Sequence, residues 1–459
     1  MAALFDIVNK ITGFIWGYPI LFLLIGGGII LTGIIGGIQF RRFGFIMKRT
    51  LGSLFDKGEQ EKKKAAGITP FQSFCVAIGG TIGTGNIVGV GAAIALGGPG
   101  ALFWMWVCGF IAMAIKYSEV CMSVQYRQKN EDGSYKAGPF IYIRDGLHNH
   151  PLAYFFGTLM LITLAIIASV HANAVTSNLE TLGLNKNITC VILAVLIILI
   201  AVTGLKGLVK VTDKMIPFMT ILYLLFALTV IFLHIGKIGE VLSLVFVSAF
   251  KGQAAVGGFT GAALAATIRW GLSRGVFSND AGLGISASLQ AQAAGIDHPA
   301  QQGMWAIVET FIDTIIVCSL TGFAILFTGV WQEGGNGSTF AAMALKDTLG
   351  NVGHIVCVVS LVLFALSSLI AIVEASKVQA VNIFGNKVAS SIMVVVVFLL
   401  VVGGSIGNLT SIFGFSDLAS GLIIFINVPS LIFLGKELRK LTKEWFDNDG
   451  DLNRIQANR

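Results

Sequence analysis

The sequence predicts an all-α polytopic membrane protein with about eleven transmembrane helices, arranged as a 5+5 inverted repeat that contains discontinuous helices. Three observations lead to this fold class. The chain is far more apolar and less charged than a soluble protein. Its basic residues gather in alternate loops between apolar segments. Two apolar segments, one in each half, are rich in glycine and carry polar residues in their middle.

The composition excludes a soluble globular domain. Of the 459 residues, 55% are hydrophobic and 12% are charged, and the mean hydropathy is +0.82. Average soluble domains carry roughly 25% charged residues. The six cysteines show no CxxC or other metal-binding spacing, so we expect reduced thiols. The opening MAALFDIVNKITGF lacks a cationic region followed by a cleavage site, so no removed signal peptide is expected.

Hydropathy divides the chain into eleven predicted spans. Each is near or above the ~20 residues that an α-helix needs to cross a bilayer. The spans cover residues 18–40, 70–96, 98–126, 152–180, 187–205, 212–234, 256–295, 301–330, 350–380, 387–405 and 408–436. We expect a single membrane domain over 1–459, with an additional N-terminal span (18–40), a first five-helix repeat (70–234), a second, inverted repeat (256–436) and a tail (437–459).

The distribution of lysine and arginine supports this count. Cytoplasmic loops carry an excess of basic residues, and 23 of the 31 basic residues fall in the loops and tail that the span count places on one side. The other side has only Lys10, Lys186, Lys237, Lys251 and Lys346. We therefore expect the N-terminus outside, the C-terminus in the cytoplasm, and the cell (inner) membrane as the location. The net charge of +7 suits an anionic lipid leaflet, and no nucleic-acid partner is expected.

The two glycine-rich segments are the most informative part of the chain. Residues 78–100 read IGGTIGTGNIVGVGAAIALGGPG, with nine glycines among 23 positions, and residues 257–290 form a similar segment with polar Ser278, Asn279 and Asp280. Glycine in a helix interior costs about 1 kcal/mol relative to alanine. Five spans separate the two segments, so they enter the membrane in opposite directions. Inverted repeats with a discontinuous helix in each half are found in secondary transporters.

Unwinding at 83–85 would create a binding site for an anion beside a cation. Free N–H groups at the start of the second half-helix suit a carboxylate, and free carbonyls at the end of the first suit a cation. The alternative is close helix packing through small residues, since Gly79-xxx-Gly83 and Gly85-xxx-Gly89 both fit that motif. Polar Thr81, Thr84 and Asn86 within the segment favour unwinding. A nucleotide site is excluded because GxxxxGK[ST] is absent.

Several motifs resemble the alanine or glycine:cation symporter family of amino-acid carriers. They are GTIGTGNIVGV (80–90), LGGPGALFWMW (96–106), KYSE (116–119), AGPFIYI (137–143), SRGVFSNDAGLG (273–284), HPAQQG (298–303) and FIDTIIVC (311–318). The resemblance implies the leucine-transporter fold with an extra N-terminal span. It also implies Na⁺-driven symport of a small neutral amino acid. The expected substrate-binding residues are Thr81, Gly83, Thr84, Gly85, Asn86, His171, Phe277, Ser278, Asn279, Asp280 and Ile372.

Two positions depart from the family pattern, and both are expected to face the substrate. The family usually has glutamine where this chain has His171, two residues before Asn173. It usually has Gly-Trp where this chain has Ala371-Ile372. Isoleucine in place of tryptophan would enlarge the pocket, so a larger neutral amino acid such as glutamine is an alternative substrate. Three roles are expected as alternatives for His171: a buried core residue, a substrate contact or a proton-coupling group.

Ser367 and Ser368 resemble the sodium-site serine pair of the leucine-transporter fold. By that resemblance, the carbonyls of Gly79, Ile82 and Phe364 would complete the Na⁺ ligands. The alternative is that each serine bonds only its own helix backbone. Na⁺ is expected as the coupling ion, H⁺ is the alternative, and no other cofactor is expected.

Charged residues inside spans are costly and are therefore candidates for function. Lys116 and Glu119 are three residues apart and are expected to pair along one helix face. Glu309 and Asp313 share a face and would repel one another. For them we expect an arginine–carboxylate cluster with Arg269 or Arg274 that closes the cytoplasmic side, with a second cation site behind it. Asp280 is expected either to assist the substrate ammonium or to cap the second half-helix.

Symport is favoured over two other functions. A channel would need a continuous polar pore lining, whereas the polar residues here concentrate near two helix breaks. An intramembrane enzyme would need a catalytic motif, and neither Gly-x-Ser-x-Gly nor HExxH occurs. The expected partners are a small neutral amino acid, Na⁺ and the lipid bilayer, and we expect a monomer.

Overall fold

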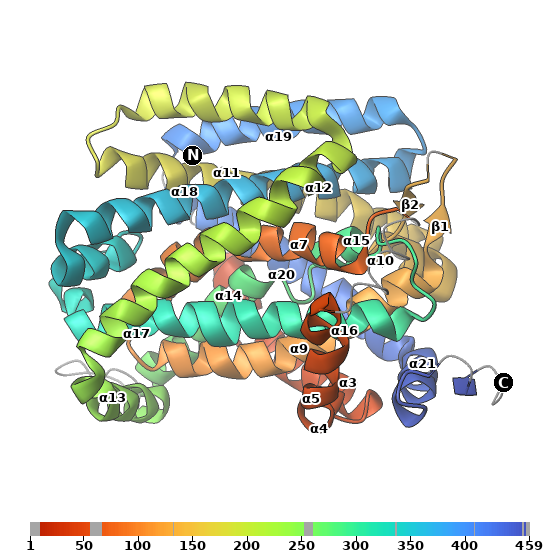
Figure 1. The fold of residues 1–459 in the computed structure, drawn as a ribbon, viewed down its shortest axis with the longest axis horizontal. Coiled ribbons are helices and arrows are strands. Elements are labelled where there is room, and N and C mark those ends of the chain that lie inside the picture. The colour runs from red at the N-terminus through yellow and green to blue at the C-terminus, as the bar shows by residue number, and fades with distance from the viewer. Residues whose placement is uncertain are drawn as a thin grey trace.

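The structure is a computed structural model that describes residues 10–55, 67–131, 133–251, 260–335, 337–407, 409–451 and 454–455. Within these ranges, eight helices are long and apolar enough to cross a membrane, and nine if one bent pair counts as a single span. Figure 1 shows most of the long helices lying side by side along the longest axis of the molecule. The all-α polytopic prediction is confirmed, and the number eleven stays a prediction.

The helices follow the predicted spans closely. The N-terminal span contains α2 (Tyr18–Leu21), η1 (Phe22–Gly26) and α3 (Gly27–Ile34), followed by α4 (Ile38–Arg41), α5 (Phe43–Arg49) and η2 (Leu51–Phe55). The long helices are α9 (Ala101–Tyr126), α11 (His150–Glu180), α12 (Lys186–Leu233), α18 (Phe340–Phe384), α19 (Lys387–Ile406) and α20 (Leu409–Phe433). One further span is continuous through α16 (Pro299–Thr310), η6 (Phe311–Val317) and α17 (Cys318–Thr328).

Helix α12 differs from the prediction. The sequence predicts spans at 187–205 and 212–234 with a basic loop between them, but the backbone is helical throughout Lys186–Leu233. Figure 1 shows α12 as two stretches that meet at a sharp bend. The predicted loop at 206–214 contains no proline, and lysine and leucine are good helix formers. The two predicted passes are thus joined by a continuous helical backbone, within which Pro217 has no N–H to donate to the carbonyl one turn earlier.

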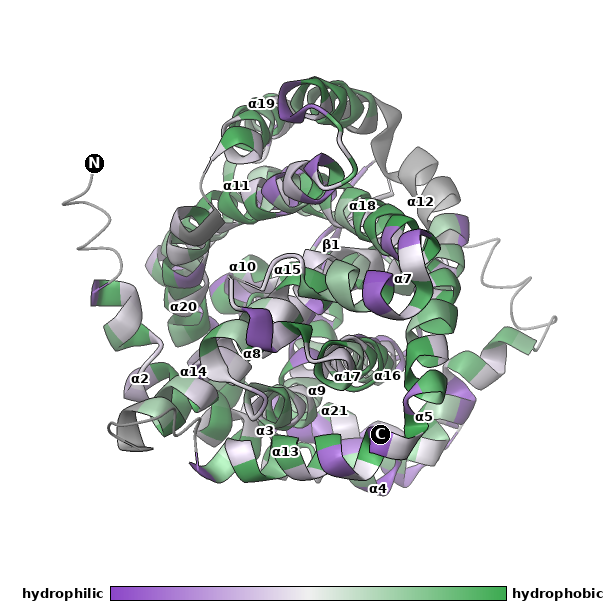
Figure 2. Ribbon diagram, turned by 90° about the vertical axis from the view of Figure 1, so that its left-hand side faces the viewer, coloured by the Kyte–Doolittle hydropathy of each residue, from purple (hydrophilic) through white to green (hydrophobic). Residues whose placement is uncertain are grey.

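The outer surface is apolar because it faces lipid. Large hydrophobic side chains that a soluble protein would bury are exposed, for example Phe22 (71%), Phe218 (62%), Phe232 (70%) and Ile392 (60%). Figure 2, viewed roughly along the long helices, shows hydrophobic residues over much of the outer helices. Polar residues such as Asn86 are completely buried inside. This inside-out distribution is the one that a bilayer imposes.

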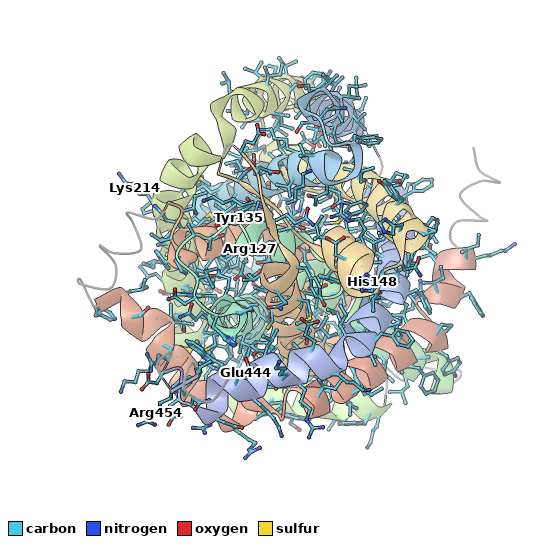
Figure 3. The ribbon with its side chains drawn as sticks, turned by 90° about the vertical axis from the view of Figure 1, so that its right-hand side faces the viewer. Arg127, Tyr135, His148, Lys214, Glu444 and Arg454 are labelled. Atoms are coloured by element: carbon cyan, nitrogen blue, oxygen red, sulfur yellow. The ribbon has the colours of Figure 1, made fainter. Side chains whose placement is uncertain are left out.

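Several short elements were not expected from the sequence. They are α10 (Pro139–Ile141), η4 (Tyr142–Gly146), η5 (Ile235–Lys237), α13 (Ile238–Lys251), η7 (Val330–Glu333), α21 (Gly435–Asp447), and the strands β1 (Gln128–Lys129) and β2 (Tyr135–Lys136), which pair antiparallel. Helix α21 opens the predicted tail and buries Leu438, Leu441, Trp445 and Phe446. It packs against α3, α9 and α16, and Glu444 marks it in Figure 3.

The β-hairpin is attached to the second glycine-rich segment. Arg127, which follows α9, lies 4.1 Å from the centre of the Tyr135 ring, and Figure 3 labels both side chains. Its Nη1 donates to the carbonyls of Ala291, at 2.8 Å, and Ala293. A guanidinium at a helix C-terminus satisfies the last carbonyls and opposes the negative end of the helix dipole. Arg127 thereby fixes the end of the second half-helix.

The first glycine-rich segment is broken as predicted. Helix α7 (Pro70–Thr81) begins with a capping box in which the Thr69 and Gln72 side chains and backbones bond reciprocally. It ends where Ile82 turns to an extended ψ of 94°. The chain resumes as η3 (Gly85–Gly89) and α8 (Val90–Gly97), and the two halves meet at 45°. We call residues 82–84 the first break.

The second segment is broken as well. Helix α14 (Thr260–Asn279) stops before Asp280, whose φ of 56° lies in the left-handed region, and α15 (Ile285–Gln290) starts after Gly284. Gly284 has a φ of 77°, and a Cβ there would lie 2.1 Å from Cγ of Pro139. Only glycine meets both demands. We call residues 280–284 the second break.

Candidate functional site

The Asn86 side chain satisfies part of the backbone at the first break. Its Oδ1 accepts a hydrogen bond from the Gly83 N–H at 2.9 Å, so one of the backbone donors freed by unwinding is already satisfied. Thr81 bonds back to the Ile78 carbonyl at 3.1 Å. The polar residues that interrupt the apolar sequence therefore satisfy the opened backbone, as buried polar groups require.

The segments that flank the two breaks lie in direct contact. A Cβ on Gly85 would approach the Ser278 Cα to 2.8 Å and the Phe277 carbonyl oxygen to 3.0 Å. Glycine at 85 is thus required by close backbone approach, in addition to any role toward a ligand. The structure thereby brings Gly85 together with Phe277 and Ser278, which the sequence assigned to one substrate site from opposite halves of the chain.

The proposed sodium ligands also meet. Ser368 Oγ lies 3.3 Å from the carbonyl of Gly79 near the end of α7 and 3.1 Å from that of Phe364. Ser367 Oγ donates to Phe364 at 2.8 Å, within its own helix. Both serines are buried. The fifth expected ligand, Ile82, lies at the break itself, and its N–H donates to Ile78 at 2.7 Å. A hydroxyl and carbonyls from two helices are the oxygen ligands that a hard cation prefers.

His171 reaches the first break from α11. Its Nδ1 lies 3.0 Å from Thr84 Oγ1, and its ring stacks on Phe277 with centroids 6.2 Å apart. Because Phe277 belongs to the end of α14, the His171 side chain contacts the first break and the helix that leads into the second. Asn173, which the sequence motif groups with it, instead donates to the carbonyls of Gly404 and Gly407 and anchors α19.

The second departure from the family pattern also adjoins the first break. A Cβ on Gly80 would lie 2.9 Å from the Cβ of Ala371. Ile372 is the next residue of α18 and is 3% exposed. Alanine at 371 lets α18 pack closely on α7.

Lys116 does not pair with Glu119, so that prediction was wrong. Its Nζ lies 2.6 Å from Glu309 Oε1 and donates to the Asn279 carbonyl at 2.8 Å. Both members of the pair are completely buried. Helices α9 and α16 pack extensively on one another. This packing brings Glu309, which is distant from Lys116 in sequence, within 2.6 Å of it. Glu119 instead accepts a hydrogen bond from Asn427.

Glu309 joins the two breaks. It accepts hydrogen bonds from Thr81 at 3.2 Å, from Ser286 at 2.7 Å and from Gln290 at 2.5 Å. Thr81 ends the first half of one discontinuous helix, whereas Ser286 and Gln290 lie in the second half of the other. The carboxylate is therefore saturated with donors, as a buried charge requires.

The predicted arginine cluster with Glu309 and Asp313 was also wrong. Arg274 forms an ion pair with Asp417 of α20, and its guanidinium lies 4.5 Å from the Phe413 ring centre. Arg269 lies over Trp270 at 5.3 Å. Arg274 thus reaches α20, and Arg269 packs on its own helix, so the carboxylates on α16 and η6 have other partners.

Asp280 does not cap the second half-helix, because the residue before α15 is Gly284 and no side chain caps it. The alternative role, toward a substrate ammonium, stays a prediction. Asp280 is 8% exposed, slightly more than Thr84, Asn86, Ser278 and Asn279, which are completely buried. The site is therefore occluded from solvent in this conformation.

Four groups at or beside the site were not predicted from the sequence: Ser286, Gln290, Thr314 and Asp417. Asp417 could have been found, because it is an acidic residue inside a predicted span. The others are neutral polar residues in apolar helices, and the sequence gives no signal that separates them from ordinary helix-bonded serine and threonine.

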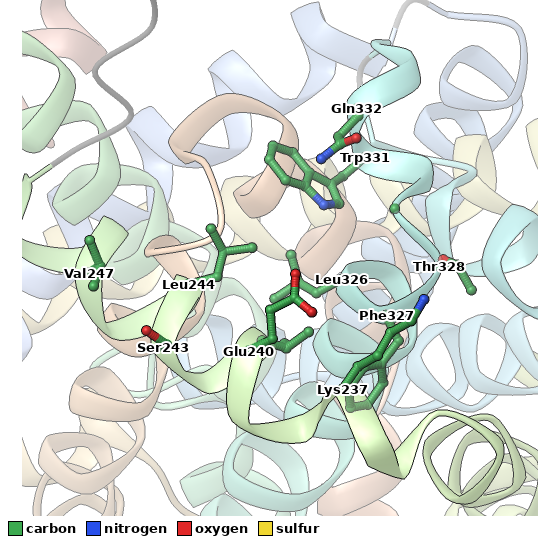
Figure 4. A pocket seen from close by; sticks show the side chains of 12 residues that line it. Lys237, Glu240, Ser243, Leu244, Val247, Leu326, Phe327, Thr328, Trp331 and Gln332 are labelled. Atoms are coloured by element: carbon green, nitrogen blue, oxygen red, sulfur yellow. The ribbon is translucent and has the colours of Figure 1, made fainter.

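A separate cavity of 530 Å³ opens between α13 and α17. Figure 4 shows Lys237 and Glu240 on one wall and Phe327 and Trp331 on another. None of its lining residues belongs to either break, so it forms no part of the site described above.

The sequence matches the Sodium:alanine symporter family over residues 1–456. It is 38% identical to the uncharacterized transporter YflA of Bacillus subtilis, over 96% of this chain and 93% of the relative. It is 33% identical to the sodium/alanine symporter AgcS of Methanococcus maripaludis (95% and 96%) and 29% identical to the probable sodium/glutamine symporter GlnT of Bacillus subtilis (96% and 90%). The crystal structure of MhsT in complex with L-phenylalanine shares the fold, with a TM-score of 0.59 and 16% identity over 83% of this chain and 98% of MhsT.

Proposed function

We propose that this chain, which belongs to the sodium:alanine symporter family, couples Na⁺ influx to uptake of a small neutral amino acid of the alanine or glycine type. It has the leucine-transporter fold and is a transporter, not an enzyme. Transport proceeds by alternating access, in which the two repeats move around a fixed site near the middle of the membrane.

The observation that carries the proposal is the contact between the segments that flank the two breaks, with the Ser368 hydroxyl 3.3 Å from the Gly79 carbonyl near the end of α7. Ser368, Gly79 and Phe364 offer oxygen ligands to Na⁺ beside the first break. The start of η3, at the positive end of a half-helix, suits the carboxylate of an amino acid. Na⁺ and substrate would then occupy neighbouring positions, so the binding of one favours the binding of the other.

One Na⁺ suffices energetically for modest accumulation. One positive charge crossing 100 mV contributes about 2.3 kcal/mol, and a tenfold concentration ratio corresponds to about 1.4 kcal/mol.

A larger neutral amino acid such as glutamine is the alternative substrate. A relative at 29% identity is named a probable sodium/glutamine symporter, and isoleucine takes the position where the family has tryptophan. Proton coupling is the alternative mechanism, with His171 as the group that would carry the proton. The contacts of His171 with Thr84 of the first break and with Phe277 of α14 support a role for it at the substrate site.

The test is uptake by purified protein in proteoliposomes. Labelled alanine, glycine, glutamine and D-alanine are compared, each with an inward Na⁺ gradient, an inward H⁺ gradient and no gradient. We expect Na⁺-dependent accumulation of alanine or glycine. Accumulation driven only by the H⁺ gradient, or no uptake of any neutral amino acid, would contradict the proposal.

We propose further that the protein lies in the cell membrane as a monomer, with its N-terminus outside and its C-terminus in the cytoplasm. The supporting observation is the gathering of 23 basic residues on one side. Single cysteines introduced at positions 60 and 450 should be protected from an impermeant thiol reagent in intact cells and labelled after lysis. Ready labelling of either cysteine in intact cells would contradict this orientation.

A further inference from the structure

The cavity between α13 and α17, which we call the α13 cavity, carries two opposite charges on one wall. Lys237 of η5 and Glu240 of α13 line it, and Figure 4 shows both side chains extending from that wall. Among the described residues, neither side chain has an ion-pair or hydrogen-bond partner. Lysine before glutamate is the less favourable order for pairing along a helix. Both charges are therefore available to a ligand.

The opposite wall adds an aromatic face. Trp331 of η7 is half-buried there, and no acceptor in the described part of the chain receives its indole N–H. The neighbouring Phe327 ring is already stacked on His234, with centroids 6.1 Å apart. Trp331 is thus the ring that can face a ligand. An indole ring attracts a cation placed over its face, so the wall suits the positive end of a ligand that carries both charges.

Helix α13 lies where lipid headgroups are expected. Figure 2, which looks along the long helices, shows α13 lengthwise across one end of the molecule. Aromatic rings join it to α9, since the Phe103 ring centre lies 5.5 Å from that of Phe246 and 5.1 Å from that of Phe250. Trp104 Nε1 donates to the Ala249 carbonyl at 3.0 Å. Tryptophan is enriched at the membrane–water interface, so the α13 cavity opens at headgroup depth.

The edge of the cavity continues as an apolar surface. Leu244 and Val247 extend the α13 wall one and two helical turns beyond Glu240, and Val247 is 49% exposed. An acyl chain along these residues would remain in apolar surroundings, whereas a free amino acid has no apolar tail to place there. The volume of 530 Å³ lies within the roughly 300–1,000 Å³ of ligand pockets.

We propose that the α13 cavity binds the headgroup of phosphatidylethanolamine, with Lys237 at its phosphate and Glu240 and Trp331 at its ammonium. Two carbon atoms separate the two charges of this headgroup. Residues three apart on a helix have Cβ atoms about 5–6 Å apart, so one headgroup meets both side chains. A primary ammonium also donates hydrogen bonds to a carboxylate, which a trimethylated one cannot do.

A headgroup in this cavity joins the two halves of the chain. Helix α13 follows α12, the end of the predicted first repeat, whereas α17 and η7 belong to the second. The lipid is therefore a ligand of the folded state and should stabilise it. In the proposed orientation it comes from the outer leaflet. The inference goes beyond the proposed function, because it requires only that the chain lies in a bilayer.

The test is lipid binding by the purified, delipidated full chain, measured by native mass spectrometry. Phosphatidylethanolamine, phosphatidylglycerol and phosphatidylcholine with identical acyl chains are compared. Phosphatidylglycerol keeps the phosphate without the ammonium, and phosphatidylcholine has a cation without N–H donors. We expect phosphatidylethanolamine to bind about tenfold more tightly than either lipid. It should also raise the Tm of the wild-type protein.

Substitutions at the two charges should act differently. Glu240→Gln should abolish the preference for phosphatidylethanolamine over phosphatidylglycerol and the rise in Tm. Lys237→Gln should weaken both lipids by about fivefold. Lys346→Gln and Asp347→Asn are the matched controls, because both residues are exposed and neither lines the cavity. They should leave binding unchanged. Lys237 and Glu240 are exposed as well, so all four variants should fold.

Three outcomes would overturn the inference. They are equal binding of the three lipids by the wild type, a preference that survives Glu240→Gln, and a loss of preference in the control variants. Labelled alanine distinguishes the other source of a zwitterion. Two alanine molecules per wild-type protein and one per Glu240→Gln variant would make the cavity an amino-acid site and overturn the lipid assignment. The proposed Na⁺ symport is decided separately by uptake and stands whichever result is found.

Discussion

The two breaks open a membrane helix in different ways. Around the first break the backbone is satisfied by neutral side chains, chiefly Asn86 and Thr81. At the second, the last carbonyl of α14 is held by a buried lysine that is itself paired with Glu309. A neutral break can bind and release ions at little cost in stability, whereas a charged break ties neighbouring helices together. We therefore expect ligand exchange mainly at the first break and structural cohesion mainly at the second.

The largest effect should come from separating the breaks. Gly85→Leu places a side chain where the Cβ alone would lie 2.8 Å from Ser278 Cα, so the two backbones must move apart. We expect uptake to be abolished while membrane insertion is retained, measured as uptake per monodisperse protein. Gly33→Leu is the control, because nothing lies within 4 Å of a Cβ at Gly33. Normal uptake by Gly85→Leu would show that the contact between the breaks is dispensable.

Removing the lysine of the second break should cost the most stability. Lys116→Met leaves Glu309 as an uncompensated buried charge, and losing one partner of a buried pair costs about 3–5 kcal/mol. Thermal unfolding of the purified protein should show the loss, and Lys116→Met with Glu309→Gln should recover much of it. Glu119→Gln tests the pairing that the sequence suggested. If it matched Lys116→Met in effect, the pairing seen in the structure would not determine stability.

A smaller and purely functional effect is expected at the neutral break. Replacing Ser367 and Ser368 together by alanine should raise the half-saturating Na⁺ concentration by about tenfold, with the fold retained. Because Ser368 reaches the Gly79 carbonyl and Ser367 bonds only within α18, Ser368→Ala should account for most of it. Substrate affinity should fall at low Na⁺ and partly recover at high Na⁺.

Ser118→Ala serves as the control for the serine pair, since that buried hydroxyl bonds only the Ala114 carbonyl of its own helix. An unchanged Na⁺ dependence in the folded double variant would remove the serines from the ion site.

The smallest effect should come from the contact between Thr84 and His171. Thr84→Val removes a hydrogen bond of 3.0 Å, which contributes about 0.5–1.5 kcal/mol. The substrate concentration for half-maximal uptake should rise a few-fold. Thr84→Ser keeps the hydroxyl and should behave like the wild type. Equal behaviour of the valine and serine variants would mean that His171 does not act through this bond.

The sequence predicted both breaks because glycine and polar residues in an apolar segment are locally unfavourable. At residues 78–100 and 257–290 this signal is strong enough to locate the discontinuity within a few residues. The same local reasoning gave the wrong partner for Lys116. Spacing within a helix identifies the nearest carboxylate along the chain, but only the packing of α9 on α16 brings Glu309 within 2.6 Å.

Long-range polar contacts were the part that the sequence could not supply. The bond between Asn86 and Asp313 joins residues 227 positions apart, and neither residue carries a spacing that points to the other. Helices α13 and α21 were missed for a different reason: they lie outside the apolar spans on which the count was based. The role of each predicted ligand stays a prediction, although the structure places most of them at one site.

The backbone of Asp280 has a consequence for how such a protein can evolve. A left-handed φ of 56° is adopted readily only by glycine, asparagine and aspartate. Codons of aspartate become codons of asparagine or of glycine by a single base change. A point mutation can therefore convert the second break from negative to neutral, or remove its side chain, without refolding the chain. The negative charge at this position can thus be lost by one mutation, whereas the shape of the turn is kept.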